Sequence, residues 1–476
     1  MEQNRPAPCS GSFRAASNLS ILGSRNPGKV SRLAGAVVSK PSRRDFIKLP
    51  GIAAAGPFFL FPDRARSAQP TLRIAQWVHP VPGFDQWFDN EYVKEWGKQH
   101  ETRVIVEHIP VERINARAAA EVAAGQGHDL FMFPWPPATY QQHALDHTEV
   151  YQAVGNRHGN VNALGHRSTF NPKTKRYFAF ADSWIPAPVH YYADYWGEAN
   201  TPYGPSNYDT LRAGARKIRA RRGVACGLPL APELESNITL QTILLAFRSS
   251  FQDEEGNICI DSSRMTIQAL KFVKALYDDG GTPEALAWGP AGNARAMLAR
   301  KTSCTVNGIG LLRTAEKEHP ELARNILLRP PLLGPGGVLS VPHVTSCQVI
   351  WNFARNKEGA KQFLVDLVDN FHTVFDKSRS CNFPIYQNTV PDLIVRLSKD
   401  PVADPPFKYE ELKDALKWTR PIGHPGFATP EAMEVFDTFV IPKMFASVVR
   451  GELSAEDAAS ATEKEMKRIY EKWRKA

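Results

Sequence analysis

Residues 72–77 read LRIAQW, and they begin the stretch that decides the fold. Their alternating apolar and polar residues predict a strand. Further strands are predicted at 103–109 and at 129–133, where the apolar run LFMF is typical of a strand covered on both faces. Aromatic residues at helical spacing predict a helix over 84–96, and an alanine-rich run predicts another over 114–124. This alternation of strands and helices indicates a parallel α/β sheet.

The loops that follow the first and third predicted strands are the candidate ligand-facing loops. In open α/β sheets a ligand lies at the carboxyl ends of the strands. These ends carry Trp77 and His79 after the first strand and Trp135 after the third. We therefore expect a binding site to include these side chains.

The first 68 residues are predicted to be a leader. SRRDFIK at 42–48 is followed by a modestly apolar segment at 49–61 and by small residues at 65–68. This order is typical of a bacterial export peptide, and Arg43, Arg44 and Phe46 resemble the twin-arginine signal. The segment has 13 residues and two prolines, whereas a membrane span needs about 20 apolar residues. The alternatives are a basic loop before a buried helix and a membrane anchor.

We predict cleavage near residue 68, which yields a periplasmic mature protein that uses the twin-arginine translocase during export. The whole chain has 58 Lys+Arg against 49 Asp+Glu. Residues 1–68 contain 11 of the former and 3 of the latter, so the remainder has 47 against 46. Because the positive excess lies in the leader, the mature chain is not predicted to bind nucleic acid.

The chain length indicates the number of domains, and the cysteine spacing bears on metal sites and disulfides. About 400 mature residues suggest two or three domains. The five cysteines after the leader are widely spaced, without a C-x-x-C motif or a histidine at metal-ligand spacing, so neither a metal nor another cofactor is predicted. In an oxidising compartment an odd number allows at most two disulfides, and the sequence does not say which residues pair. These cysteines are Cys226, Cys259, Cys304, Cys347 and Cys381.

Several motifs together resemble family 1 extracellular solute-binding proteins, the relatives of maltose-binding protein. LRIAQW, the aromatic helix, the strand VIVE at 104–107 and the segment AAGQGHDLF at 123–131 resemble the amino-terminal lobe of that family. The block at 177–196, the Asn-Gly pair at 307–308 and NKEGAKQFL at 356–364 resemble its later segments. The sequence departs from the family pattern at two places: Tyr-Ala-Asp at 192–194 replaces Tyr-Asn-Lys, and no aromatic residue follows the Asn-Gly pair. The second departure argues against a maltose-type pocket.

The resemblance implies an α/β fold of the two-lobed type II periplasmic-binding-protein kind. Each lobe would be a mainly parallel sheet flanked by helices, and a hinge would join the lobes. The expected division is lobe 1 from residues 69–182 plus 307–347, and lobe 2 from 183–306 plus 348–476. The implied partners are a small-molecule solute, which we predict to be a carbohydrate, and the membrane subunits of an ABC importer. The protein is expected to be a monomer.

Aromatic residues beside polar ones are the main signal for the ligand. A sugar presents apolar C–H faces and a rim of hydroxyls, so its site needs flat rings and hydrogen-bonding groups. For the aromatic residues the alternative is packing, for His79 a loop hydrogen bond, and for Glu233 simple surface exposure. The candidate ligand-binding residues are Trp77, His79, Trp135, Asp182, Trp184, Glu233, Trp288 and Asn307.

The predicted function is the binding component of an ABC importer that takes up a sugar or oligosaccharide. One alternative keeps the fold and changes the ligand to a polyamine, a phosphoester or an organic anion. The other is an exported carbohydrate-active enzyme, which needs two carboxylates roughly 5 to 9 Å apart. The candidate loops supply only Asp182 and Glu233, and the sequence has no H-E-x-x-H or G-x-S-x-G motif. We therefore expect no enzymatic activity.

Overall fold

The computed structural model describes residues 69–260 and 264–475. The predicted leader, with Arg43, Arg44 and Phe46, lies outside the described residues. Within the described ranges, no helix combines the length and the apolar character needed to cross a membrane.

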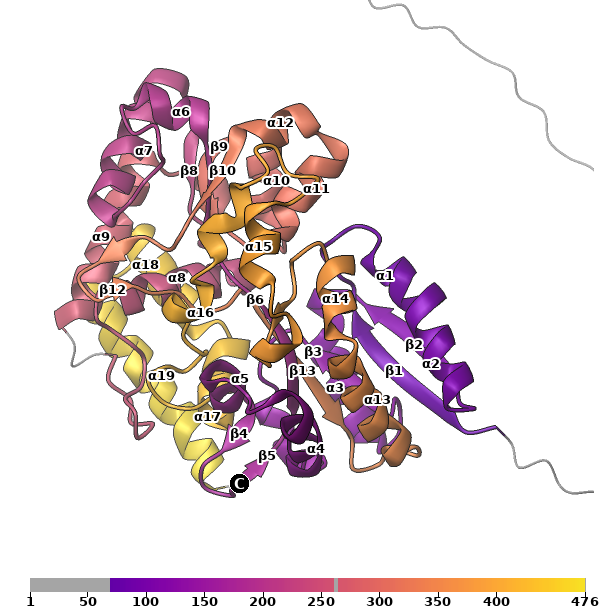
Figure 1. Ribbon diagram of the computed structural model, residues 1–476. Helices are drawn as coiled ribbons and strands as arrows, with labels where there is room; N and C mark the ends of the chain where they lie inside the picture. The colour runs from indigo at the N-terminus through magenta and orange to yellow at the C-terminus, as the bar shows by residue number, and fades with distance from the viewer. Residues whose placement is uncertain (1–68, 261–263, 476) are drawn as a thin grey trace, which may run out of the picture. The chain divides into compact units, whose positions relative to one another are not determined.

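Two mixed sheets form the framework of residues 69–475 (Figure 1). The first sheet has the strand order β14 (Phe383–Pro384), β6 (Phe180–Ile185), β13 (Val344–Ile350), β3 (Leu130–Phe133), β1 (Thr71–Trp77) and β2 (Arg103–Ile109). The second has the order β10 (Ile326–Arg329), β7 (Val189–Tyr192), β9 (Thr302–Val306) and β8 (Ala225–Gly227). Two short hairpins complete the strands: β4 (Phe170–Asn171) with β5 (Arg176–Tyr177), and β11 (Leu333–Gly334) with β12 (Gly337–Val338).

The parallel strands predicted from LRIAQW onward are confirmed. β1 pairs in parallel with both β2 and β3. β13 runs antiparallel to β3 and β6, and in the second sheet only β8 and β9 pair in parallel. The expectation of mainly parallel sheets was therefore wrong. Two consecutive strands that pair in parallel need a crossover connection within one sheet. A strand whose chain arrives from the other sheet can pair in either direction.

The helices before the third strand follow the predicted pattern with one extension. The aromatic segment forms α1 (Phe84–Trp87), a π-helical turn η1 (Phe88–Tyr92) and α2 (Val93–Gln99). It continues past Gly97, where a Cβ atom would lie 2.7 Å from the Thr102 carbonyl oxygen. The glycine therefore permits close packing and does not end the helix. α3 (Ile114–Ala124) has its predicted bounds, and Gly125 ends it in the left-handed conformation.

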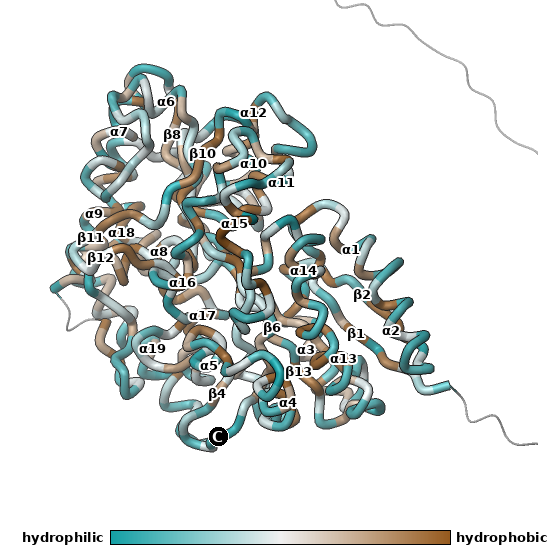
Figure 2. The backbone as a smooth tube through the Cα atoms, in the orientation of Figure 1, coloured by the Kyte–Doolittle hydropathy of each residue, from teal (hydrophilic) through white to brown (hydrophobic). Residues whose placement is uncertain are grey.

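Apolar side chains of the two sheets and of the helices around them pack in two main clusters. Figure 2 shows hydrophobic residues along strands of both sheets and hydrophilic ones along many of the loops and helix surfaces. The first cluster includes β1, β3, β6 and β13 with helices α4 (Thr148–His158), α5 (Ala163–Thr169), α11 (Gly310–Glu318), α13 (Lys357–Asp369) and α14 (Phe371–Lys377). The second includes β7 with helices α7 (Tyr208–Arg222), α8 (Leu234–Ala246), α9 (Arg264–Gly280), α18 (Val440–Val449) and α19 (Ala455–Lys475). The other helices are α6 (Ala193–Glu198), α10 (Gly292–Leu298), α12 (Pro320–Asn325), α15 (Leu393–Ser398), α16 (Ala415–Trp418) and α17 (Pro430–Asp437).

The strands change sheet at points other than those expected. β6 continues to Ile185 in the first sheet, beyond the expected boundary at residue 182. β10 pairs with β7 in the second sheet, although it lies within 307–347. β13, α13 and α14 belong with the first sheet, although most of them lies beyond residue 347. A division into two lobes, one around each sheet, remains our proposal.

Candidate functional site

Three of the candidate residues lie around one small cavity beside the first sheet. Trp77, His79 and Asp182 line this cavity, whose volume is about 30 Å³. Such a space suits about one water molecule and is too small for a sugar. The cavity that these three residues line is therefore not the proposed ligand site.

The cavity is lined by hydrogen-bonded polar groups. His79 Nε2 lies 2.9 Å from Asn382 Oδ1, and burial lowers the pKa of His79 to about 4, so the ring is neutral at pH 7. Asp182 accepts hydrogen bonds from Ser183 Oγ at 3.1 Å and from Gln348 Nε2 at 3.3 Å. Burial raises the pKa of Asp182, because the charged carboxylate loses hydration.

Trp184 is part of the core of the first sheet. Its side chain is 1% exposed, its Nε1 donates to the Pro384 carbonyl oxygen at 3.3 Å, and its ring packs on Phe383. This is the packing role considered as the alternative, so we leave Trp184 out of the proposed site. Trp288 lies partly buried in the loop before α10, close to Gly292.

Glu233 caps a helix and is buried, so the alternative of surface exposure was wrong. It is the N-cap of α8 and is 6% exposed. Its carboxylate accepts from the backbone N of Glu235 at 2.9 Å and from the N and Oγ of Ser236 at 2.7 and 2.5 Å. Burial and the neighbouring Glu235 raise the pKa of Glu233 to about 10. Glu233 therefore remains protonated at neutral pH.

Glu235 has one carboxylate oxygen that remains available. Its Oε1 accepts from the backbone N of Ala291 at 3.2 Å, whereas its Oε2 is buried and has no hydrogen-bond partner among the described residues. Its side chain is 8% exposed. A buried acceptor without a partner is costly, and a bound ligand or water that donates to it removes the cost.

A chain of polar contacts extends from Glu235 to the segments between the sheets. Asn293, two residues after Ala291, donates from Nδ2 to the Val306 carbonyl oxygen at 3.0 Å and accepts from Asn307 Nδ2 at 3.0 Å. The backbone N of Asn307 bonds to the Pro188 carbonyl oxygen, between β6 and β7. Asn307 thus lies where the two sheets are connected, as its position in the sequence predicted.

His343 lies at the same connection. Its backbone N donates to the Ile185 carbonyl oxygen at 2.8 Å, and its ring lies close to Gly308. Burial lowers the pKa of His343, while Glu235 acts in the opposite direction. Both ring nitrogens are buried without hydrogen-bond partners in the described part of the chain. His343 and Glu235 are thus two incompletely bonded polar groups in one neighbourhood.

Trp135 connects the end of β3 to α17. Its ring centroid lies 6.1 Å from that of Phe436, and its side chain is 8% exposed. Its Nε1 is close enough to Asp437 to lower the pKa of that carboxyl, yet it makes no well-formed hydrogen bond within residues 69–475. Burial outweighs this effect and raises the pKa of Asp437 to about 7.

Glu235, His343 and Asp437 were not predicted as site residues. His343 precedes β13, so the signal that identified Trp77 and Trp135, a position at the carboxyl end of a strand, does not apply to it. Glu235 lies two residues from Glu233, but only the fold of the α8 N-terminus shows that both are buried. Of the residues described, no three His, Cys, Asp or Glu side chains are placed to hold a metal ion.

Comparison with known sequences gives a partial match. No family model matches this sequence. A Brucella abortus (strain 2308) protein to which a binding role is ascribed is 24% identical over 178 residues, which are 37% of this chain and 43% of that protein. The chain thus spans less than half the length of the curated relative that it matches.

Comparison with solved structures covers nearly the whole described chain. A solute-binding protein of an ABC transporter from Thermotoga lettingae, bound with α-D-tagatose, has a TM-score of 0.70 at 16% identity and covers 84% of this chain and 99% of its own. Maltose-bound MalE3 from T. maritima has a TM-score of 0.66 at 18% identity, with coverages of 84% and 99%. The chain from residue 69 onward therefore has the α/β fold of the solute-binding proteins of ABC transporters.

Proposed function

We propose that the protein is the periplasmic binding component of an ABC importer and binds a sugar or oligosaccharide between lobes built on the two sheets. The observation that supports this most is the group of buried polar atoms near the connections between the sheets. Glu235 Oε2 offers an acceptor, and the ring nitrogens of His343 and the Nε1 of Trp135 offer further polar contacts. A ligand that contacts both lobes stabilises their closed arrangement without any bond being made or broken.

The ligand class follows from the same atoms. A sugar hydroxyl both donates and accepts, so it suits an acceptor such as Glu235 Oε2 beside a neutral imidazole. The indole of Trp135 offers a flat face and an N–H group. The solved structures bound with tagatose and maltose support a carbohydrate.

A ligand panel tests the proposal directly. We expect one saccharide or polyol to bind saturably to the full chain, measured by tryptophan fluorescence and calorimetry. Glu235→Gln should weaken binding by at least about tenfold, because it replaces a charge-assisted hydrogen bond. Trp135→Phe should reduce the fluorescence change, because it removes the indole, while it keeps an aromatic ring at this position. Trp87→Phe is the matched control, since this similarly buried tryptophan is the last residue of α1, outside the proposed site, and its substitution should leave the affinity unchanged.

A cationic amine is the second candidate ligand. The buried carboxyls of Glu233 and Glu235 favour it, because an ammonium group would pair with a carboxylate there. Binding of putrescine or spermidine alone would replace the sugar assignment. Recovery of a cleaved saccharide would instead show an enzyme, and failure of every sugar and amine to bind would contradict both binding proposals.

A further inference from the structure

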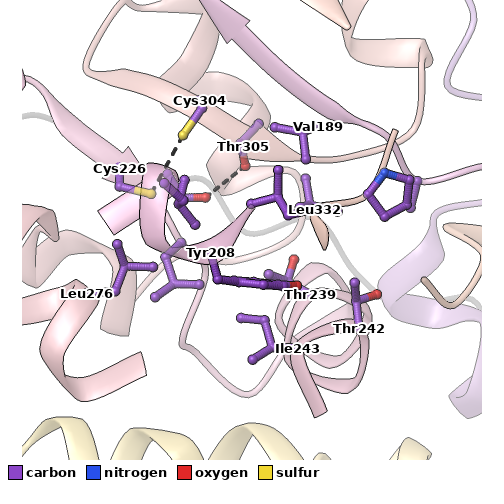
Figure 3. Close-up of a pocket in the computed structure, with 16 residues that line it drawn as sticks. Val189, Tyr208, Cys226, Thr239, Thr242, Ile243, Leu276, Cys304, Thr305 and Leu332 are labelled. Atoms are coloured by element: carbon purple, nitrogen blue, oxygen red, sulfur yellow. Dashed lines mark hydrogen bonds between the residues drawn. The ribbon is translucent and has the colours of Figure 1, made fainter. Parts of the chain in front are cut away.

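Two buried cysteines lie side by side in the second sheet. Cys226 on β8 and Cys304 on β9 have Sγ atoms 3.7 Å apart, and their side chains are 4% and 2% exposed. Figure 3 shows the two sulfur atoms facing each other next to an apolar cavity. The strands pair in parallel, but β9 has one extra residue between the pairs Ala225–Thr302 and Gly227–Thr305. This irregularity brings Cys304 beside Cys226.

The geometry is compatible with a covalent bond between these sulfurs. A disulfide has an S–S distance of about 2.0 Å, so the sulfurs must approach each other by about 1.7 Å. Neighbouring strands lie about 4.8 Å apart, which falls within the Cα separations that disulfides span. Both cysteines line the cavity, whose volume is about 40 Å³, so free space adjoins the sulfurs that must move.

We propose that Cys226 and Cys304 form a disulfide when β8 and β9 become accessible in an oxidising compartment. The oxidant is another disulfide, of a small molecule or of an oxidoreductase. One cysteine thiolate attacks it, forming a mixed disulfide and releasing one thiolate. The second cysteine thiolate then attacks the mixed disulfide, closing the Cys226–Cys304 bond and releasing the other. The two cysteine thiols lose two electrons and two protons, and the oxidant gains them as two thiols.

The burial of the pair sets when this reaction takes place. Each thiol must become a thiolate to react, and burial together with the neighbouring sulfur raises the pKa of Cys226. In the folded chain the Cys226 thiol is therefore protonated, and burial shields both sulfurs from an oxidoreductase. The bond forms when β8 and β9 become accessible, during folding or, in a chain that has crossed the membrane already folded, during transient opening. Once closed, it is equally shielded from reductants.

The disulfide would also stabilise β8 and β9, the strands that support the proposed binding site. Thr305 follows Cys304 and donates from Oγ1 to the Gly227 carbonyl oxygen at 2.8 Å. Asn293 Nδ2 bonds to the same Oγ1 at 3.1 Å, and Asn293 in turn holds Asn307. Closing the bond fixes β8 against β9 beneath these contacts. This effect on the binding site rests on the proposed function, whereas formation of the disulfide does not.

The test refolds the reduced full chain in a buffer of reduced and oxidised glutathione. After an acid quench, alkylation under denaturing conditions and digestion, mass spectrometry should detect a peptide that links Cys226 to Cys304. The oxidised protein should melt roughly 5 °C above the reduced protein. Cys259→Ser is the matched control and should retain the link, since a serine can keep the hydrogen bond to the Ser250 carbonyl oxygen.

Cys226→Ser and, should that variant not fold, Cys304→Ala should lose both the linked peptide and the difference in melting temperature. The wild-type peptide map decides the matter without either variant. Full alkylation of both cysteines after oxidative refolding overturns the proposal, and so does a link from either one to a different cysteine.

Discussion

Glu233 and Glu235 are two carboxyls buried at the start of one helix, and the raised pKa of Glu233 makes stability depend on pH. The pKa of Glu233 is raised from 4.5 to about 10 in the folded protein. Between these values the folded chain binds more protons than the unfolded chain. The contribution of the Glu233 carboxyl to stability is therefore fully present below about pH 4.5 and is lost as the pH rises towards 10.

Glu235→Gln should reduce this pH dependence, while the part that is due to the burial of Glu233 remains. Glutamine can still accept from the Ala291 backbone N and can donate to Glu233, so Glu233 ionises without a neighbouring charge. We expect the variant to be about 1–3 kcal/mol more stable than wild type at pH 8.5 and to differ little at pH 4.5. Urea unfolding at both pH values measures the effect. Glu149→Gln, an exposed first-turn residue of α4, should show no such change. A constant difference at both pH values would argue against an effect of Glu235 on the pKa of Glu233.

The sequence predicted the type of site residue better than the environment of each side chain. Glu233 and Asn307 were selected from their loops; Glu233 caps α8, and Asn307 lies at a connection between the sheets. Trp184 was selected for the same reason but lies in the core, because strand β6 continues through it to Ile185. Whether such a ring faces the core or the edge depends on where the strand ends and on its neighbours, and neither is a local property.

Helices show the same contrast between local and non-local causes. The bounds of α3 follow from an alanine-rich run and a terminal glycine, which are local signals. Gly214 in α7 is explained only by the tertiary structure. A Cβ atom there would collide with the ring of Trp196, which is fully buried and donates from Nε1 to the Ser303 carbonyl oxygen at 3.1 Å.

Gly214→Ala should therefore destabilise the protein, although alanine is normally the better helix former. We expect a loss of about 1–3 kcal/mol in the free energy of unfolding, because Trp196 cannot move without leaving its hydrogen bond. Gly155→Ala in α4 is the matched control, since a Cβ atom there meets nothing within 4 Å. It should stabilise the protein by about 0.5–1 kcal/mol. Equal effects of the two substitutions in thermal unfolding would contradict the proposed contact.

For the molecule as a whole, the sequence predicted an α/β fold but not the sheet that each strand joins. The first three strands follow from periodicity and from short connections. Nothing in the local sequence of β10 or β13 indicates that β10 pairs with β7 whereas β13 pairs with β3. That choice depends on pairing between residues more than a hundred positions apart, which a single sequence does not reveal.

Export is the prediction that concerns the whole chain. If Arg43 and Arg44 direct the protein to the twin-arginine translocase, Arg43→Lys with Arg44→Lys should leave it in the cytoplasm at nearly its full precursor mass. The charge is unchanged in this double variant, so loss of export would reflect the guanidinium pair and not the positive charge of the leader. Exported wild-type protein should begin near Ala68 or Gln69, measured by intact mass after cell fractionation. Lys40→Arg is the matched control for an exchange of basic residues and should be exported like wild type. Export of the double variant at the wild-type level would instead show that another route carries this chain across the membrane.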